Sequence, residues 1–190
     1  MQPLINLAPA SLSLGDELFL RPSTFKIFIS GKMRGGPLRE ERVAAAEAVE
    51  STQFAHAWYW ERDANAGPYS SEGVCVGHAR TSDGLILILG RTLTDITRAE
   101  FRAAHLAGAP CYIFTQSFAN QDKAVRKFVK DNRDDAITAP FGNLSELRTQ
   151  ITGALIQFVV GAGREICSGR EGVANSHPRK SDARHEWSSL

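Results

Sequence analysis

A glutamate in a predicted helix after a buried strand is the residue best placed to do chemistry in this sequence. The apolar run Gly84–Leu89 has the pattern of a strand that is buried on both faces of a parallel sheet. The following segment, Thr97–Leu106, is predicted to be a helix that carries Glu100 in its first turn. Ligands of open α/β sheets lie outside the carboxyl ends of the strands, so we expect Glu100 at a ligand crevice.

A glycine-rich basic loop is the second candidate for chemistry. It follows the predicted strand Phe25–Ser30 and has the sequence GKMRGGP. Glycines let backbone N–H groups approach an anion, and a helix expected to begin at Pro37 would add its positive end. The residues expected to contact the phosphate and sugar of a ligand are Ser30, Gly31, Lys32, Met33, Arg34 and Gly35. Because the loop has neither P-loop nor GxGxxG spacing, a solvated connecting loop is the alternative.

Three further positions complete the candidate site. Asp83 precedes the strand Gly84–Leu89, Gly90 follows it, and Thr97 begins the next helix. Asp83 could hold a ribose hydroxyl or a base edge, although an Asp before a strand is as often a turn residue. We expect all three to meet Glu100 and the glycine-rich loop at one edge of the sheet.

Other polar and aromatic residues are weaker candidates. His56 and His78 have no ligand partners at suitable spacing, so no metal site is expected. Trp58 and Trp60 alternate along a strand and are assigned to the core rather than to base stacking. The basic stretch Lys123–Lys130 is interpreted as a solvated helix face.

Strands and helices alternate along the chain, which predicts a parallel sheet of about five strands with helices on both faces. The expected fold is therefore a single three-layer α/β domain of flavodoxin-like, TIR-like topology. Asp95 or Thr97 is the expected N-cap of the helix that carries Glu100, and Gly108 is its expected stop. The remaining expected strands are Phe54–Trp60, Cys111–Thr115 and Ala136–Ala139, and the remaining helices are Leu38–Glu50, Ser71–Ala79, Gln121–Asn132 and Leu144–Val160.

Composition limits the class of protein. With 190 residues, one domain at 23–162 is expected, with an N-terminal arm at 1–22 and a disordered tail at 163–190. A net charge of +1 gives no reason to expect nucleic-acid binding, and no apolar run reaches membrane-spanning length. The chain has three widely spaced cysteines, which favour buried thiols in a reducing cytoplasm over a disulfide framework.

Several motifs are similar to those of known families. FKIFISGKMRGG and TRAEFRAAHLAGAPCYIF resemble segments of nucleoside 2-deoxyribosyltransferases and deoxynucleotide N-hydrolases. LREER, WYWERDA and the T-x-x-E-F-x-x-A block resemble bacterial TIR-like domains of unassigned function. The resemblance covers about Phe25–Val160 and implies that Glu100 is the catalytic carboxylate.

The chemistry implied by the resemblance is cleavage or transfer at an N-glycosidic bond. A carboxylate below the sugar ring stabilises the oxocarbenium ion that forms as the base leaves. The alternative role for Glu100 is to complement the dipole at a helix N-terminus. Arg98 and Arg102 flank Glu100 and favour a phosphorylated or dinucleotide ligand over a neutral nucleoside.

NAD is the favoured substrate, ahead of a deoxynucleotide, and no cofactor is expected. The resemblance also implies a role in defence against phage, as a homo-oligomer or with a partner protein of a defence system. A nucleotide-sensing or assembly module that turns nothing over is the hypothesis from a different class.

Overall fold

The structure of the chain is a computed structural model that describes residues 24–33, 38–117 and 119–167. It contains a parallel sheet whose strands alternate with helices along the sequence. The strands are β1 (Phe25–Gly31), β2 (Ala55–Trp58), β3 (Gly84–Leu89), β4 (Cys111–Gln116) and β5 (Ile137–Phe141). The helices are α2 (Arg39–Ser51), α3 (Trp60–Asp63), α4 (Ser71–Arg80), α5 (Asp95–Leu106), α6 (Lys123–Asp131) and α7 (Leu144–Cys167).

The strand order is β2-β1-β3-β4-β5, and each neighbouring pair is parallel. This is the flavodoxin-like order, in which the chain direction across the sheet reverses between β1 and β3. The predicted α/β fold with a five-stranded parallel sheet is therefore confirmed. Ligands of such folds lie at the reversal point, outside the carboxyl ends of β1 and β3.

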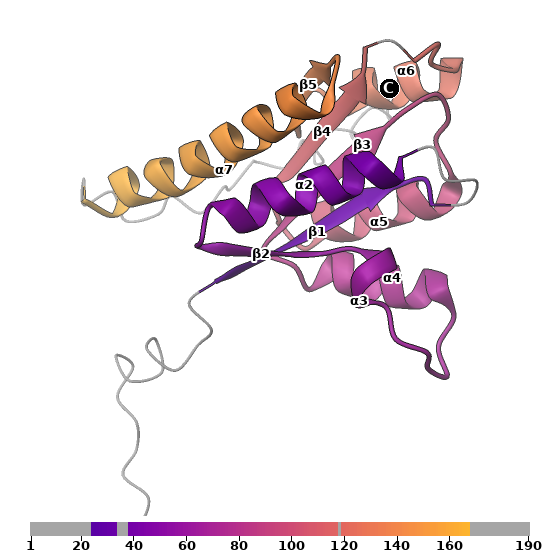
Figure 1. Cartoon of the computed structure of the whole chain (residues 1–190), viewed down its shortest axis with the longest axis horizontal. Helices are drawn as coiled ribbons and strands as arrows, with labels where there is room; N and C mark the ends of the chain where they lie inside the picture. Colours follow the sequence, from indigo (N-terminus) through magenta and orange to yellow (C-terminus); the bar gives the residue numbers. More distant parts are fainter. Residues whose placement is uncertain (1–23, 34–37, 118, 168–190) are drawn as a thin grey trace, which may run out of the picture. The chain divides into compact units, whose positions relative to one another are not determined.

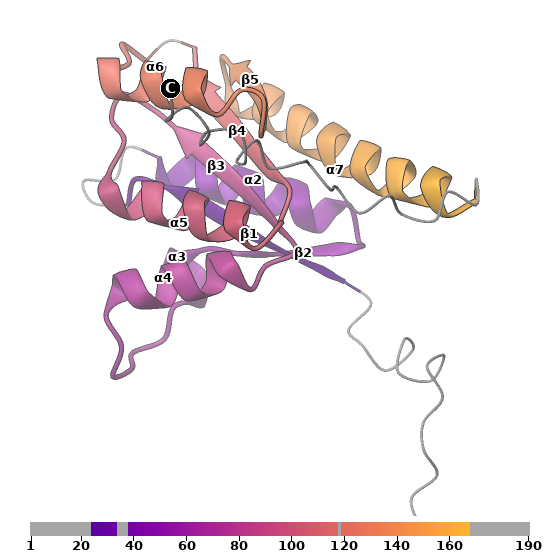
Figure 2. The same ribbon diagram turned by 180° about the vertical axis from the view of Figure 1, so that it is seen from behind.

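Helices cover both faces of the sheet (Figures 1 and 2). On one face, α2 and the first part of α7 pack against isoleucines of β1 and β3, such as Ile29 and Ile88. On the other face, α4, α5 and α6 pack against the alternate residues of the same strands, such as Phe28 and Leu87. Successive side chains of a strand point to opposite faces, so a run such as GLILIL in β3 supplies both cores.

The glutamate-bearing helix α5 begins two residues earlier than predicted. Its N-cap is Thr94, whose hydroxyl accepts a hydrogen bond from the Thr97 backbone N–H at 3.2 Å. Glu100 therefore lies in the second turn and not in the first. Gly108 follows the end of the helix with φ of 79°, the left-handed conformation expected of a helix stop.

Strand β2 is shorter than the aromatic run that predicted it. The strand ends at Trp58, and Trp60 begins the short helix α3, which the sequence analysis did not anticipate. Trp58 is 8% exposed and belongs to the core as expected, whereas Trp60 is only partly buried and packs against the same apolar cluster. The basic face of α6 is exposed, also as expected, while Val125 and Phe128 are buried beneath it.

The described residues fall into two compact units that divide between Leu155 and Ile156. The sheet and its covering helices belong to the first unit. The expected arm at 1–22 lies outside the described residues, as does most of the expected tail at 163–190. Among the helices that the structure describes, none is long and apolar enough to cross a membrane.

Candidate functional site

Glu100 and Ser30 meet at the carboxyl end of β1. The Ser30 hydroxyl donates a hydrogen bond to Glu100 Oε2, and both residues are buried, at 2% and 3% exposure. The thiol of Cys75 on α4 makes a further hydrogen bond to the same carboxyl group. Strand β1 and helices α4 and α5 thus converge on one carboxylate, at the edge of the sheet where the fold predicts a ligand.

Burial raises the pKa of Glu100 to about 7. The hydrogen bonds from Ser30 and Cys75 and the positive charge of Arg42 act in the opposite direction, but they offset burial only in part. A carboxyl group with a pKa near neutrality exists in both protonation states at physiological pH. It can act as a general acid when protonated, and it can stabilise a cation or activate water when ionised.

The new position of Glu100 in α5 also bears on its alternative role. The field of a helix dipole falls off within the first turn, and that turn already contains Asp95. Glu100 lies beyond it and is buried against other elements. Complementing the dipole therefore does not explain the placement of Glu100.

The arginines that flank Glu100 in the sequence do not face it. Residues two apart on a helix point in nearly opposite directions. The guanidinium of Arg98 lies over the ring of Phe128, 5.6 Å from its centroid, and Arg102 is exposed. The arginine whose charge acts on Glu100 is instead Arg42 of α2. Arg98 and Arg102 therefore give no reason to expect a phosphorylated ligand at Glu100.

The glycine-rich loop leaves β1 beside the end of β3. Lys32 Nζ donates a hydrogen bond to Thr92 Oγ1 at 3.0 Å, which joins the two loops across the reversal point. Gly31 is packed closely, since an added Cβ would lie 3.2 Å from the Ile88 carbonyl oxygen. Met33 packs against the apolar cluster under α5. Arg34, Gly35 and the rest of the expected phosphate loop to Pro37 lie outside the described residues.

Gly90 forms part of the same edge, at the end of β3. A Cβ at this position would lie 2.8 Å from Gln116 Oε1 and 3.3 Å from a methyl group of Leu38. Gln116, at the end of β4, is held in place because its Nε2 donates to Glu41 Oε1 at 2.6 Å. Glycine is therefore the residue that fits between β4 and the start of α2.

Thr97 is buried at the start of α5, one turn before Glu100. Its hydroxyl lies 2.8 Å from the hydroxyl of the N-cap Thr94. These two threonines fix the first turn of the helix. The structure therefore shows Thr97 in a capping role, and its contact with a ligand stays a prediction.

Asp83 is at the other edge of the sheet, so the expectation that it meets Glu100 is wrong. It precedes the amino end of β3, and its Oδ2 accepts a hydrogen bond from the Lys26 backbone N–H at 2.8 Å. Its own N–H donates to the Lys26 carbonyl at 2.8 Å. Asp83 therefore ties the start of β3 to β1, which matches the turn role that was the alternative.

A surface pocket of about 440 Å³ lies along α4, away from the site. Its lining includes Tyr69, Val74 and His78, and His78 stacks on Trp58 with ring centroids 4.1 Å apart. Neither Glu100 nor Ser30 lines this pocket. Within the described part of the chain, no group of three or more His, Cys, Asp or Glu side chains is arranged to hold a metal ion.

Arg42 and Cys75, which act on Glu100, and Glu61, which forms an ion pair with Arg42, were not predicted from the sequence. The usable signal was the spacing of Arg42, which follows the buried Leu38 by four residues and precedes the buried Val49 by seven. An arginine on the inward stripe of a helix requires a buried partner. Nothing in the local sequence identified that partner as Glu61.

Residues 26–156 match the family described as "Domain of unknown function (DUF4062)". The chain belongs to this family. The matched range begins in β1 and ends in α7, so it contains Ser30, Arg42 and Glu100. The candidate site is thus built entirely within the DUF4062 domain. No curated protein matches the chain.

Several solved structures are similar to this chain at low identity. A conserved protein from Enterococcus faecalis V583 has a TM-score of 0.47 at 14% identity, covering 69% of this chain and 99% of that one. The CMP N-glycosidase BcmB of Clostridium botulinum has a TM-score of 0.47 at 12% identity, covering 66% and 96%. A flavodoxin-like domain from Synechococcus has a TM-score of 0.42 at 9% identity, covering 70% and 98%. At these values the likenesses carry no inference about function.

Proposed function

We propose that this DUF4062 domain is an N-glycosidase that cleaves the bond between base and sugar in a nucleotide, with Glu100 as its catalytic carboxylate. The observation that supports the proposal most strongly is the placement of Glu100. It is a buried carboxyl group with a pKa of about 7, at the carboxyl ends of β1 and β3. The resemblance to nucleoside-processing families implies a catalytic role for Glu100, and its position at the carboxyl ends of the strands is consistent with that role.

The proposed reaction consumes water. The bond from C1′ of the sugar to the base nitrogen breaks, and the electron pair leaves with the base. The ionised Glu100 stabilises the oxocarbenium ion at C1′, and a water oxygen then bonds to C1′. For a deoxynucleotide, a proton from that water neutralises the departing base. For NAD, the positively charged nicotinamide leaves neutral once it takes the electron pair, and the water proton is released to solvent. The ionised Glu100 can also accept the water proton, because its pKa is near neutrality.

Lys32 and the backbone of Gly31 are the proposed phosphate contacts. Both belong to the exit of β1, and Lys32 is held toward β3 by Thr92. A phosphorylated ligand is proposed on this basis, with NAD ahead of a deoxynucleotide. A deoxynucleotide N-hydrolase or a deoxyribosyltransferase would use the same carboxylate. A role in defence against phage remains part of the proposal, through the resemblance to bacterial TIR-like domains.

The burial of Glu100 favours a second candidate function. At 3% exposure the carboxyl group is shielded from solvent in this conformation. A domain that binds a nucleotide and transmits the binding event, without turnover, would need no exposed carboxylate. An enzyme needs the surrounding loops to admit the sugar to Glu100.

Incubation of the purified protein with NAD and with each deoxynucleotide, followed by chromatography for the free base, tests the proposed function. We expect wild-type protein to release a base from one of these substrates and Glu100→Gln to release it at least about 100-fold more slowly, equivalent to about 3 kcal/mol or more. Asp83→Asn is the matched control, because this carboxylate lies at the opposite edge of the sheet. Binding without release of a base would support the sensing module, and equal rates for wild type and Glu100→Gln would exclude Glu100 from the mechanism.

A further inference from the structure

Arg42 is the bulkiest side chain among the fully buried ones that the structure describes, at 1% exposure. It lies on the inward face of α2 between the buried residues Leu38 and Val49. A guanidinium carries its charge at every physiological pH, so burying it is costly unless its N–H groups are paired. The partners of Arg42 therefore indicate what the arginine is for.

The guanidinium of Arg42 joins two elements that border the site. Its Nε donates to Glu61 Oε2 at 3.1 Å, and its Nη2 pairs with Glu61 Oε1. Its Nη1 donates to the backbone carbonyl of Lys32 at 2.8 Å. The two contacts with Glu61 form a bidentate ion pair with α3. The contact with the Lys32 carbonyl holds the chain where it leaves β1.

The same guanidinium lies beside the end of β1. Its Nη1 would be 3.6 Å from a Cβ added at Gly31, the residue that follows Ser30. Ser30 in turn donates to Glu100. A chain of neighbouring residues therefore connects Arg42 to Glu100 at the carboxyl ends of the strands. It runs through Gly31 and Ser30.

The charged and titratable groups around Glu100 come from four elements. Ser30 of β1 and Cys75 of α4 make hydrogen bonds to the carboxyl group, and Arg42 of α2 supplies a positive charge. Glu61 of α3 acts on the neighbouring Cys75, whose pKa its negative charge helps to raise. Arg42 is the one positive charge found to act on Glu100 among the described residues.

We propose that Arg42 and Glu61 form a positioning pair for the site: Arg42 holds the exit of β1 through the Lys32 carbonyl and presents a positive charge to Glu100, and Glu61 fixes the guanidinium in that position. The catalytic meaning of this pair rests on the proposed N-glycosidase function. The effect of the pair on the structure and on the charge of Glu100 does not rest on that function, because it concerns Glu100 in the free protein.

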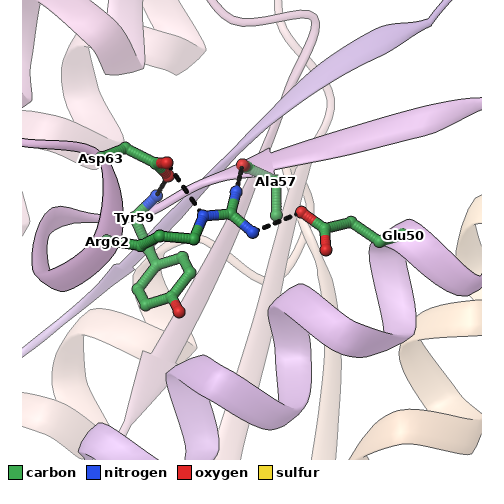
Figure 3. A network of polar contacts seen from close by, with 5 residues as sticks. All are labelled: Glu50, Ala57, Tyr59, Arg62 and Asp63. Carbon is green, nitrogen blue, oxygen red and sulfur yellow. Dashed lines mark hydrogen bonds and ion pairs between the residues drawn. The ribbon is translucent and has the colours of Figure 1, made fainter.

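Helix α3 is anchored independently of Arg42, so it presents Glu61 in a fixed place. Figure 3 shows the anchor: Arg62 pairs with Glu50 of α2 at 2.5 Å and also donates to the carbonyl of Ala57. Asp63 accepts from the backbone N–H of Tyr59 at 2.9 Å. The exposed Arg148–Glu47 pair also involves α2 but does not touch α3, so it provides the control.

The pair is tested by titrating the Glu100 carboxyl carbon by NMR in protein with ¹³C-labelled glutamate, with Glu100→Gln identifying the signal. Arg42→Met removes the positive charge, so the pKa of Glu100 should rise by about one pH unit or more. Glu61→Gln leaves Arg42 without its neutralising partner, so the pKa of Glu100 should fall. The double variant should return the pKa toward the wild-type value, and Arg148→Gln, which removes an exposed arginine paired with Glu47 of α2, should leave it unchanged.

The opposite directions distinguish this proposal from a loosened fold. If either variant merely admitted water, burial would weaken and the pKa of Glu100 would fall in both. A fall in both variants, or no change in either, would overturn the proposal. Should Arg42→Met fail to fold, Glu61→Gln and Arg42→Lys decide: Arg42→Lys keeps the charge and should keep the pKa near its wild-type value, and a rise as large as that expected for Arg42→Met would count against the proposal.

The titration needs no turnover, so its outcome is separate from that of the proposed function. If no nucleotide releases a base and the two variants still move the pKa of Glu100 in opposite directions, the pair stands and the N-glycosidase does not. If a base is released but neither variant changes the pKa of Glu100, the N-glycosidase stands and the positioning pair does not. For an active enzyme, the pH at which kcat/KM is half-maximal should move with the Glu100 titration in each variant.

Discussion

The hydroxyl of Ser30 donates a hydrogen bond to the carboxylate of Glu100 across 70 positions of sequence. Ser30 ends β1 and Glu100 lies in α5, so this contact joins the strand at the reversal point of the sheet to the helix that follows β3. Both side chains are buried. A polar pair buried at the ligand edge of a parallel sheet indicates a functional site more strongly than either residue does alone.

Ser30→Ala should raise the pKa of Glu100 above its wild-type value of about 7. The hydrogen bond from Ser30 favours the ionised carboxylate, so its loss favours the protonated form. The NMR titration of Glu100 measures the change. Ser82→Ala is the control, because this buried serine precedes the amino end of β3 and donates to the His78 carbonyl. An unchanged Glu100 titration in Ser30→Ala would contradict the prediction.

Glu100→Gln should be more stable than wild type at pH 8, and the difference should shrink as the pH falls toward 5. The folded-state pKa of Glu100 is raised to about 7 from 4.5, so between these values the folded protein binds more protons than the unfolded chain. Wild-type stability therefore falls as pH rises through this window, by at most about 3 kcal/mol. Glutamine does not titrate and lacks this penalty.

Urea unfolding of both proteins at pH 5, 6, 7 and 8 measures the difference. Asp83→Asn serves as the comparison, since the Asp83 side chain is exposed. A Glu100→Gln protein that is less stable than wild type at pH 8 would show that the carboxylate is held for stability rather than for function.

Strands that are buried on both faces were predictable from the sequence because their signal is local. The bounds of β3, Gly84–Leu89, and the start of β4 at Cys111 match the prediction, as does the glycine stop at Gly108. The end of β2 was predicted less well. Aromatic residues continue to Trp60 in either conformation, and the turn after Trp58 is fixed by contacts of the Arg62 side chain with Glu50 of α2 and with the Ala57 carbonyl.

The site was predictable only where the order of elements dictates it. Ser30 and Glu100 follow neighbouring strands, so parallel topology brings them to one edge. Asp83 precedes its strand, and the same rule places it at the far edge, where it pairs with Lys26. Cys75 belongs to an outer helix and reaches Glu100 through packing between α4 and α5, for which the sequence carries no spacing signal.

Cys75 and Cys111 should resist alkylation by iodoacetamide at pH 8 in the folded protein. Burial raises the pKa of Cys75 to about 12, with further contributions from Glu100 and Glu61, and raises the pKa of Cys111 to about 11. The reactive thiolate is therefore scarce at pH 8. Peptide mass spectrometry before and after addition of urea measures labelling at each position. Rapid labelling of Cys75 in the folded protein would contradict its burial beside Glu100.

Gly90→Ala should destabilise the protein by about 1–3 kcal/mol, because the space at the end of β3 is already filled. The new methyl group would lie 2.8 Å from Gln116 Oε1. A free glutamine could move aside, but Gln116 is held by its hydrogen bond to Glu41 at 2.6 Å. The alanine therefore either breaks that contact or displaces the backbone of β3. Thermal unfolding of the variant measures the cost.

Two further variants separate crowding from a general effect of replacing glycine. Gly77→Ala in α4 has no atom within 4 Å of the new Cβ and should stabilise the helix by about 0.5–1 kcal/mol. In the double variant Gly90→Ala/Gln116→Ala, the obstacle is gone, so its loss of stability should be smaller than the sum of the two single losses. Additive losses would show that Gly90 is required for its backbone and not for the room it leaves to Gln116.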